Sequence, residues 1–404
     1  MTPRERILTD LKHREPDMVP LDLGGTESSG ITGIAYNRLR EYLGLGPGET
    51  QIFDVYQQIT KIEDDLREIL RPDTVPLLIE PLDWKSFALS DGSSCRIPEK
   101  WNPERDTNGD LVVRDDNGMI TARMPDGGYY FEPVYSPLAG IKHPGDLKAF
   151  ADQIESYDWP LFADESLERI AERARYLYEN TDLAVVANLQ LHLLAAGQQL
   201  RGYEAFMIDL VADKPLANAL LEMLTDAYIR RCERYFERVG DYIQVVLVND
   251  DLGTQAGPML SPECYREMIW PHQKRLFSFI REKSGAFILF HSCGSVHTFI
   301  PDLIEAGVDA LNPVQVSAKG MDTARLKEQY GRDITFWGGG CDTQRVLWQG
   351  PPQRIRDEVK RRIGDLARGG GFVFTQVHNI QPDVPPENIM AMYEAFEEYR
   401  SYNG

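Results

Sequence analysis

The sequence lacks a long uninterrupted hydrophobic run, and its cysteines are few and scattered. Its most apolar stretch, residues 183–197, is interrupted by Asn188, Gln190 and His192 and falls short of the about 20 residues that span a bilayer. The first residues are charged and contain no apolar segment of the signal-peptide kind. Five widely spaced cysteines do not make the framework of a small disulfide-rich fold, so reduced thiols are expected. We therefore expect a cytoplasmic protein that makes no contact with a membrane.

Basic residues are scarce relative to acidic ones. The 43 Lys and Arg residues stand against 63 Asp and Glu residues, which gives a formal net charge of −20. Nucleic-acid binding needs clustered cations on the protein, so we expect no nucleic-acid partner. The glycine-rich phosphate-binding motifs and the GxSxG and HExxH motifs are also absent. The share of hydrophobic residues, 42%, is that of an ordinary globular protein.

Eight short apolar segments recur along the chain. Most are continuous rather than alternating, as expected for strands that are buried on both faces of a parallel sheet. Segments of helical periodicity separate them, so the pattern predicts an α/β fold, the (β/α)8 TIM barrel. The predicted strands cover residues 19–24, 74–79, 183–189, 242–250, 286–291, 309–315, 334–340 and 372–378.

The helical periodicity is clearest between the last two predicted strands. There Ile355, Val359, Ile363 and Leu366 recur every three or four residues, which places them on one face of a helix. We predict one TIM-barrel domain over residues 1–404.

Residues 84–140 interrupt the alternation after the second predicted strand. They lack helical periodicity and contain four Asx-Gly turn signals, of which Asn117-Gly118 lies between two β-type runs and predicts a hairpin. A β-rich insertion in this loop would lie over the C-terminal mouth of the barrel, where active sites are found. Its aromatic residues either pack a small core of their own or form a wall for a substrate or partner: Trp84, Phe87, Trp101, Tyr129, Tyr130 and Phe131.

One histidine and two cysteines lie at the end of a predicted strand or just after it. His291 ends the fifth strand, Cys293 comes two residues later, and Cys341 follows the seventh strand. The carboxyl ends of barrel strands meet at one rim, and imidazole and thiolate groups are the ligands that Zn²⁺ prefers. The pattern favours a catalytic zinc site with three protein ligands, although buried cysteines often serve only as small packing residues. Cys232 and Cys264 are predicted to be packing residues.

Further polar residues lie at the same predicted rim. Asp250, Asp251 and His378 are candidate catalytic residues, and the two aspartates are favoured because their strand neighbours the one that carries His291. The alternative for each residue taken singly is a helix cap or a hydrogen bond within a loop. The candidate substrate-binding residues are Asn249, Asn312, Gln315, Gln376 and Glu27.

Several runs of this sequence resemble the uroporphyrinogen decarboxylase superfamily. The similar runs are residues 2–24, 290–315, 337–344 and 378–396. The second of them contains the sequence His-Ser-Cys-Gly. The resemblance spans nearly the whole chain and is more specific in its C-terminal half. It implies a TIM barrel, in agreement with the predicted strands.

Within that superfamily the chain is similar to the cobamide-dependent methyltransferases. These carry a His-x-Cys pair and a distant cysteine as zinc ligands, a pattern that His291, Cys293 and Cys341 match. The decarboxylases carry an arginine-rich segment after the first strand, whereas residues 23–31 contain no arginine. The resemblance therefore implies zinc and the transfer of a methyl group to or from a corrinoid (cobalamin) cofactor.

The resemblance also implies partners. No corrinoid-binding domain is evident in the sequence, so the corrinoid is expected on a separate protein. The small-molecule methyl donor or acceptor is a methoxylated aromatic, a methylamine or a thiol, and the long insertion favours demethylation of a donor. A homo-oligomer is compatible with the sequence. The alternatives are a decarboxylase of the same fold and a non-enzymatic barrel that binds a small molecule or a metal.

Overall fold

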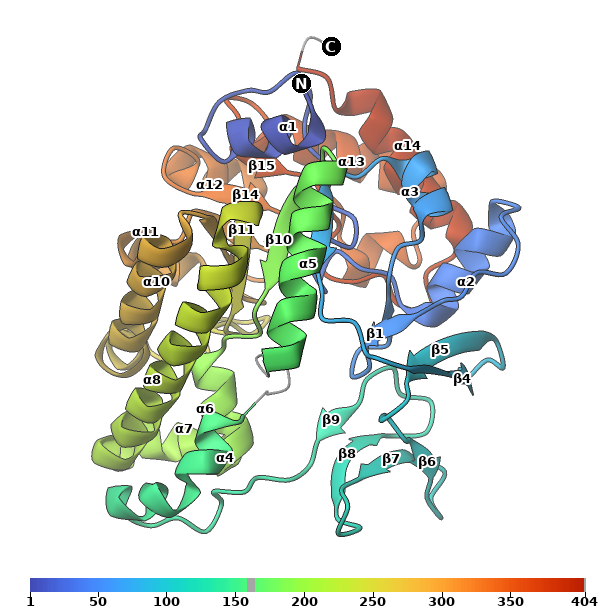
Figure 1. The fold of residues 1–404 in the computed structure, drawn as a ribbon. Helices are drawn as coiled ribbons and strands as arrows, with labels where there is room; N and C mark the ends of the chain where they lie inside the picture. The colour runs from blue at the N-terminus through green and yellow to red at the C-terminus, as the bar shows by residue number, and fades with distance from the viewer. Residues whose placement is uncertain (158–163, 403–404) are drawn as a thin grey trace.

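Seven parallel strands form the centre of the protein. A computed structural model describes residues 1–157 and 164–402. The strands are hydrogen-bonded in the order β15-β14-β13-β12-β11-β10-β3, so each strand after β3 pairs with the one that precedes it in the barrel sequence. Figure 1 shows this sheet enclosed by helices. The strands are β3 (Thr74–Leu77), β10 (Ala184–Asn188), β11 (Val245–Asn249), β12 (Phe287–His291), β13 (Ala310–Asn312), β14 (Thr335–Trp337) and β15 (Phe372–Val373).

The eighth position of the ring is held by a single parallel bridge. Leu21 pairs with Phe374 beyond the end of β15, and the Leu21 carbonyl accepts a hydrogen bond of 2.8 Å from the backbone N–H of Asp73 beside β3. Leu21 lies in the first predicted strand, which therefore connects the two edges of the sheet. The predicted (β/α)8 barrel is confirmed: seven of the eight predicted strands form the sheet, and the first is represented by the bridge at Leu21.

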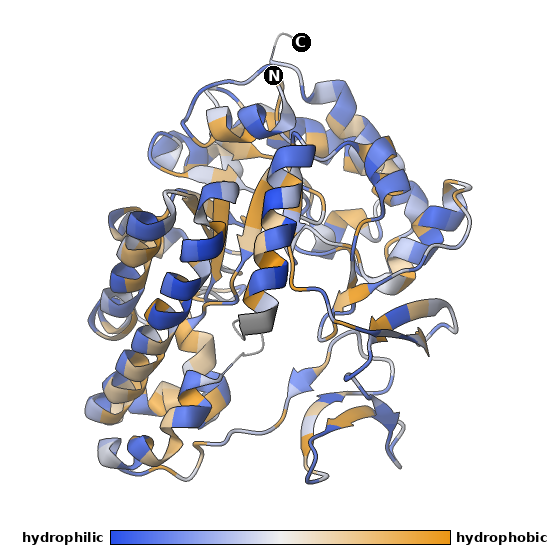
Figure 2. Cartoon of the chain, in the orientation of Figure 1, coloured by the Kyte–Doolittle hydropathy of each residue, from blue (hydrophilic) through white to orange (hydrophobic). Residues whose placement is uncertain are grey.

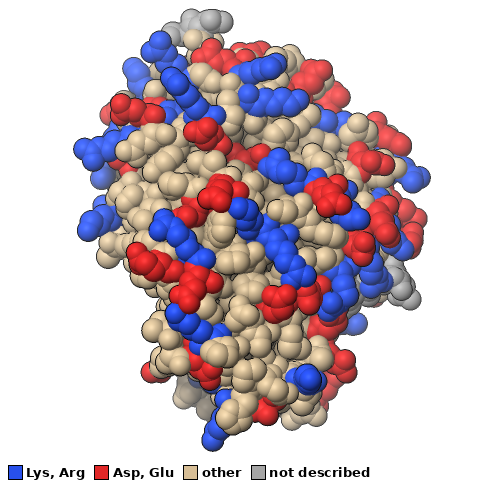
Figure 3. Space-filling view, turned by 90° about the vertical axis from the view of Figure 1, so that its left-hand side faces the viewer, with Lys and Arg blue, Asp and Glu red and all other residues tan. Residues whose placement is uncertain are grey.

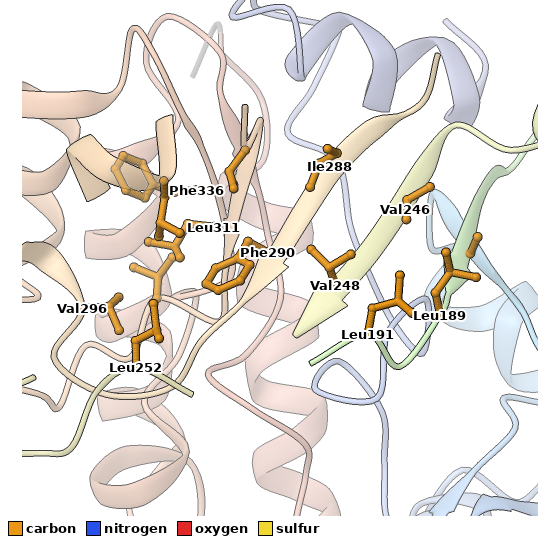
Figure 4. Packing of buried hydrophobic residues seen from close by; sticks show 14 of the residues in the cluster. Leu189, Leu191, Val246, Val248, Leu252, Ile288, Phe290, Val296, Leu311 and Phe336 are labelled. Carbon is orange, nitrogen blue, oxygen red and sulfur yellow. The ribbon is translucent and has the colours of Figure 1, made fainter. Parts of the chain in front are cut away.

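Residues of the strands alternate between two hydrophobic clusters, as the pleat of a β-strand requires. Val245, Leu247 and Leu289 belong to a cluster inside the barrel, whereas Val246 and Val248 belong to the cluster between the sheet and the helices. Figure 4 shows the second cluster, in which Ile288 and Phe290 of β12 lie next to the β11 residues and Leu311 and Phe336 lie beyond them. Both faces of each strand are apolar for this reason.

Amphipathic helices cover the outside of the sheet (Figures 1 and 2). The predicted apolar stripe of Ile355, Val359, Ile363 and Leu366 is buried on α13. Among the described residues, no helix is both long enough and apolar enough to cross a membrane. The helices that follow barrel strands are α5 (Asp164–Asn180), α6 (Leu193–Arg201), α7 (Tyr203–Ala212), α8 (Lys214–Val239), α9 (Pro262–Cys264), α10 (Trp270–Ser284), α11 (Ile300–Ala306), α12 (Thr323–Tyr330), α13 (Pro352–Leu366) and α14 (Pro386–Tyr399).

The remaining elements outside the barrel are short. Ile7 of α1 and Leu11, the residue that follows this helix, belong to the cluster inside the barrel. The short helices are α1 (Pro3–Asp10), α2 (Gly33–Tyr42), α3 (Asp64–Leu70) and α4 (Ala151–Glu155), and a two-stranded hairpin consists of β1 (Ile52–Asp54) and β2 (Ile59–Thr60). Short 3-10 helices are η1 (Pro144–Phe150), η2 (Gly240–Tyr242) and η4 (His297–Phe299), and π-helical turns are η3 (Tyr265–Ile269) and η5 (Thr343–Leu347).

The insertion after β3 is β-rich, as predicted. Two antiparallel sheets, β4-β5 and β6-β7-β8-β9, occupy it, and Asn117-Gly118 turns the chain between β7 and β8. Trp101 packs against the rings of both Tyr56 and Phe131, each with a centroid distance of 5.3 Å, so part of the predicted aromatic set forms a small local core. The strands are β4 (Trp84–Ala88), β5 (Ser94–Pro98), β6 (Glu104–Arg105), β7 (Leu111–Arg114), β8 (Ile120–Met124) and β9 (Glu132–Pro133).

The acidic excess does not gather into one patch on the face seen in Figure 3, where Lys and Arg side chains are interspersed with Asp and Glu. The ion pairs of the described residues include Arg266 with Asp302 and Lys274 with Glu305 on the helical layer. The division of the chain into one domain stays a prediction.

Candidate functional site

Three metal-ligating side chains meet at the C-terminal mouth of the barrel. His291 ends β12, Cys293 lies in the loop that follows, and His378 lies in the loop after β15. One potential ligand atom from each of them lies within 4.8 Å of the other two. The Nε2 atom of His291 is 3.5 Å from the Sγ atom of Cys293. Two imidazoles and one thiol at this spacing form a donor set that suits Zn²⁺.

The ring of His291 is oriented by Asn312 at the end of β13. The Oδ1 atom of Asn312 lies 2.6 Å from Nδ1 of His291, and its Nδ2 atom donates to the Trp337 carbonyl at 2.9 Å. Because Nδ2 is committed as a donor, Oδ1 accepts from His291, which places the proton on Nδ1 and leaves Nε2 free as a ligand atom. Asn312 was predicted to bind substrate, but it is fully buried behind His291 and supports that residue.

His378 is held in an unusual backbone conformation. Its φ angle is +69°, a left-handed value that a side chain with a Cβ atom rarely adopts. Burial, together with the nearby ring of His291, lowers the pKa of His378 to about 4. The imidazole is therefore neutral at pH 7, which is the form that binds a metal ion. His378 was predicted as a catalytic residue, and the structure places it among the potential metal ligands.

Cys341 was predicted as the third zinc ligand, and the structure does not bring it to the other two. Its side chain is fully buried in the hydrophobic cluster between the sheet and the helices, where Glu358 and Arg362 of α13 are the charged groups near it, together with Asp342. Burial raises the pKa of the Cys341 thiol well above its usual value. Among the described residues, His378 rather than Cys341 stands with His291 and Cys293 in the group of potential ligands.

Asp250 was predicted as a catalytic acid or base, but all of its bonds serve the structure. Its carboxylate accepts hydrogen bonds of 3.0–3.1 Å from the backbone N–H groups of Leu193, Leu194 and Ala195 at the start of α6. Nε2 of Gln273 on α10 donates a fourth bond at 3.0 Å. With 2% of its surface exposed, Asp250 anchors two helices to β11 and is not among the residues that line the cavity described below.

Asp251 and Gln315 hold the loop that carries Cys293. Asp251 accepts a bond of 2.8 Å from the backbone N–H of Cys293, and Oε1 of Gln315 accepts one of 2.7 Å from Gly294. Burial and the negative charge of Asp251 raise the pKa of the Cys293 thiol well above its usual value. Gln315 was predicted to bind substrate, and so was Gln376, which is fully buried; neither lies in the wall of the cavity described below.

A cavity of about 600 Å³ opens beside two of the potential ligands, His291 and His378. The predicted residues Glu27 and Asn249 lie in its wall, as do His291 and His378. Asp54 of the β1-β2 hairpin was not predicted, because this short hairpin has no clear signal in the sequence. Further polar residues of the wall, which the prediction treated only as interruptions of an apolar run or left out, are Gln57, Asn188, Gln190, His192 and Gln199.

The insertion covers part of this mouth. Phe131 and Pro133 lie in the wall of the cavity, and the hydroxyl of Tyr130 donates a hydrogen bond of 3.1 Å to Oδ1 of Asn379, the neighbour of His378. Nδ2 of Asn379 in turn donates to Oε1 of Gln57 at 2.9 Å. The predicted aromatic residues therefore serve both as a local core and as part of the site's wall.

Glu27 makes a pH-dependent contribution to stability that can be measured. Burial, and then the negative charge of Asp54, raise its pKa from 4.5 to about 7. The folded state therefore binds this proton more tightly than the unfolded state, and stability falls as the pH rises from about 4.5 to 7. In Glu27→Gln, the fall in the free energy of unfolding over this pH range should be smaller than in the wild type by about 1–3 kcal/mol. Urea unfolding at pH 5 and pH 8 checks this.

The exposed Glu132 beside the cavity offers a matched control. Glu132→Gln should leave the difference between the two pH values unchanged. The same difference in wild type and Glu27→Gln would contradict the assignment.

Comparison with known proteins gives the family. The family model for uroporphyrinogen decarboxylase (URO-D) matches residues 183–399, more than half of the chain. A uroporphyrinogen decarboxylase from Thermus thermophilus is 26% identical over 245 residues, which cover 59% of this chain and 67% of that protein. A methylcobamide:CoM methyltransferase from Methanosarcina barkeri is 26% identical over 218 residues, 54% of this chain and 59% of that one.

A solved structure shares the fold over the whole chain. It is a methyltransferase from Methanosarcina mazei, with a TM-score of 0.59 and 18% sequence identity, and the match covers 99% of both chains. At this identity the likeness concerns the fold alone. Together with the matched residues 183–399, the parallel barrel with its site at the C-terminal mouth leads to one conclusion: the chain belongs to the uroporphyrinogen decarboxylase (URO-D) family.

Proposed function

We propose that this protein is a zinc-dependent methyltransferase that moves a methyl group between a small substrate and a corrinoid carried by a partner protein. The observation that carries the proposal is the group of His291, Cys293 and His378, two of which, His291 and His378, lie in the wall of the cavity. The relative from Methanosarcina barkeri, named as a methylcobamide:CoM methyltransferase, supports the choice of reaction within the family.

The residues present fit a zinc ion. Two imidazole nitrogens and one thiol sulfur are provided, and catalytic zinc sites usually combine three protein ligands with one open position. Nε2 of His291 is available because Asn312 holds Nδ1, and His378 is neutral at pH 7. When bound, zinc would supply a Lewis acid for the heteroatom that carries or receives the methyl group.

The chain's own residues would position the substrate. The cavity joins the potential ligands directly to Asn249 and Glu27, so a substrate of its size contacts both. The loop bonds of Asp251 and Gln315 keep Cys293 in place. A mouth at the end of the barrel gives a corrinoid on another protein access from outside, and the insertion narrows that entrance through Tyr130 and Phe131.

A decarboxylase acting on a porphyrinogen is disfavoured by the charge of the cavity. Such a substrate carries many carboxylates, and none of the described residues in the wall is Lys or Arg. Two carboxylates, Glu27 and Asp54, lie there instead.

A spectral assay tests the proposed reaction. The purified protein, with zinc, is mixed with cob(I)alamin and candidate methyl donors, and then with methylcobalamin and thiols, while the cobalamin spectrum is followed. We expect methyl transfer in one direction, and a rate at least about 100-fold lower in Cys293→Ala. Cys264→Ala, a change on α9 away from the site, should keep the rate. Decarboxylation of a porphyrinogen without methyl transfer would overturn the proposal.

A further inference from the structure

The cavity beside the proposed metal group has two carboxyl groups in its wall and, among the described lining residues, no Lys or Arg. Glu27 and Asp54 both line it, and Asp54 is the charged group that acts most strongly on Glu27. Glu27 accepts one bond of 2.8 Å from Nε2 of Gln190, and Asp54 accepts bonds from the backbone N–H groups of Tyr56 and Gln57. All of these donors are neutral, so a cation bound in the cavity would favour the charged form of both carboxyl groups.

Among the described residues, two side-chain amide oxygens of the same wall accept no hydrogen bond. Nδ2 of Asn188 is committed to the carbonyl oxygen of Gly25 at 3.3 Å, so the remaining amide atom is Oδ1. Asn188 is 6% exposed, and within the described part of the chain its Oδ1 atom has no hydrogen-bond partner; the same holds for Oδ1 of Asn249. Both residues lie in the wall of the cavity, and their unpartnered oxygens add negative potential there, which favours a ligand with positive charge.

Aromatic rings complete the wall. Phe53, Tyr56 and Phe131 line the cavity, and Trp101 packs behind the last two with centroid distances of 5.3 Å. The face of an aromatic ring carries negative electrostatic potential and attracts organic cations, quaternary ammonium groups in particular. Rings that are fixed by a neighbour need little further ordering when a ligand binds against them.

From these three features we infer that the substrate carries a small organic ammonium group, which Glu27, Asp54 and the aromatic rings hold while its heteroatom faces the His291, Cys293 and His378 group. The inference rests on the proposed function for the choice of reacting end, but the recognition of the cation is a binding property of the cavity alone. The same charges would weaken the binding of substrates that carry a carboxylate or phosphate.

Equilibrium binding tests the inference without any methyl transfer. Choline serves as the probe, because 3,3-dimethylbutan-1-ol has the same shape and hydroxyl group but carbon in place of the charged nitrogen. Isothermal titration calorimetry on the full-length protein, with and without zinc, measures both ligands and the anion 4-methoxybenzoate. We expect choline to bind at least about 10-fold more tightly than the alcohol, and 4-methoxybenzoate to bind more weakly than either.

Two variants locate the cation. Glu27→Gln and Asp54→Asn should each weaken choline binding by about 10-fold or more and leave the affinity for the alcohol unchanged. Glu132→Gln, which removes an exposed carboxylate outside the cavity, should bind choline like the wild type. Equal affinity for choline and the alcohol, or unchanged choline binding in both cavity variants, would overturn the inference.

The outcomes separate this inference from the proposed function. Choline binding in a protein that transfers no methyl group would contradict the proposed reaction and leave the cation site in place. Methyl transfer from a neutral or anionic donor, with no preference for choline over the alcohol, would support the proposed reaction and contradict the cation site.

Discussion

Cys293→Ala and His378→Ala should each lower the zinc content of the purified protein from about one equivalent per chain to less than about 0.1. The reason is geometric: potential ligand atoms of His291, Cys293 and His378 lie within 4.8 Å of one another, and removal of one leaves only two protein ligands. Two ligands hold zinc far more weakly than three. Inductively coupled plasma mass spectrometry after dialysis against a weak chelator measures the content.

Cys341→Ala is the decisive control for this assignment. Cys341 is fully buried in the cluster between sheet and helices, so its loss should leave zinc bound at about one equivalent. Cys264→Ala should behave in the same way. Loss of zinc in Cys341→Ala, with retention in His378→Ala, would contradict the structure and restore the ligand set predicted from the sequence.

The barrel could be predicted because its strands are buried on both faces. Continuous apolar runs such as residues 245–248 serve two hydrophobic clusters at once, and few other folds need eight such runs separated by amphipathic helices. The insertion could be located because hairpins need turn residues: Gly118 adopts a φ of +79° between β7 and β8. Both predictions rest on local patterns that the fold requires.

Part of the site follows from the pleat of the strands. Side chains alternate along a strand, so the residue two positions after an inward-facing one also faces inward. Val245 and Leu247 face the interior, and Asn249 follows them into the cavity wall. Leu289 is followed in the same way by His291. This rule was available in the sequence, and it also predicts that Asp250 faces the helices.

Cys341 and His378 could not be placed by the same rule. Gly338 and Gly339 follow β14 with φ angles of +123° and +74°, which end the regular alternation before Cys341 is reached. His378 has a positive φ of its own. Where the backbone leaves the strand conformation, spacing in the sequence no longer tells which way a side chain points.

The polar wall of the cavity depends on contacts between distant segments. Asp54 lies on the short hairpin formed by β1 and β2. Its charge acts on Glu27 only because the folded barrel brings the loops of several strands together. Such contacts have no local signature in one sequence. The cation site that we infer depends on Glu27, Asp54 and the aromatic rings lying in one wall, which no single segment of the sequence reveals.

Asp250→Ala should destabilise the protein by about 3–5 kcal/mol. The change removes the acceptor of four hydrogen bonds and leaves the buried N–H groups of Leu193, Leu194 and Ala195, as well as Nε2 of Gln273, without their partner. Each such loss costs about 1–3 kcal/mol, partly relieved by local rearrangement. The midpoint of urea unfolding measures the effect.

The neighbouring residue separates a structural role from a catalytic one. Asp251 is about half exposed and accepts one bond, from the backbone of Cys293, so Asp251→Ala should cost no more than about 1 kcal/mol. Asp250→Asn keeps the size of the side chain but places an NH₂ group against N–H donors, so it should fall between the wild type and Asp250→Ala in stability. A catalytic Asp250 would give the opposite pattern, in which Asp250→Ala unfolds at the wild-type midpoint and loses only its turnover.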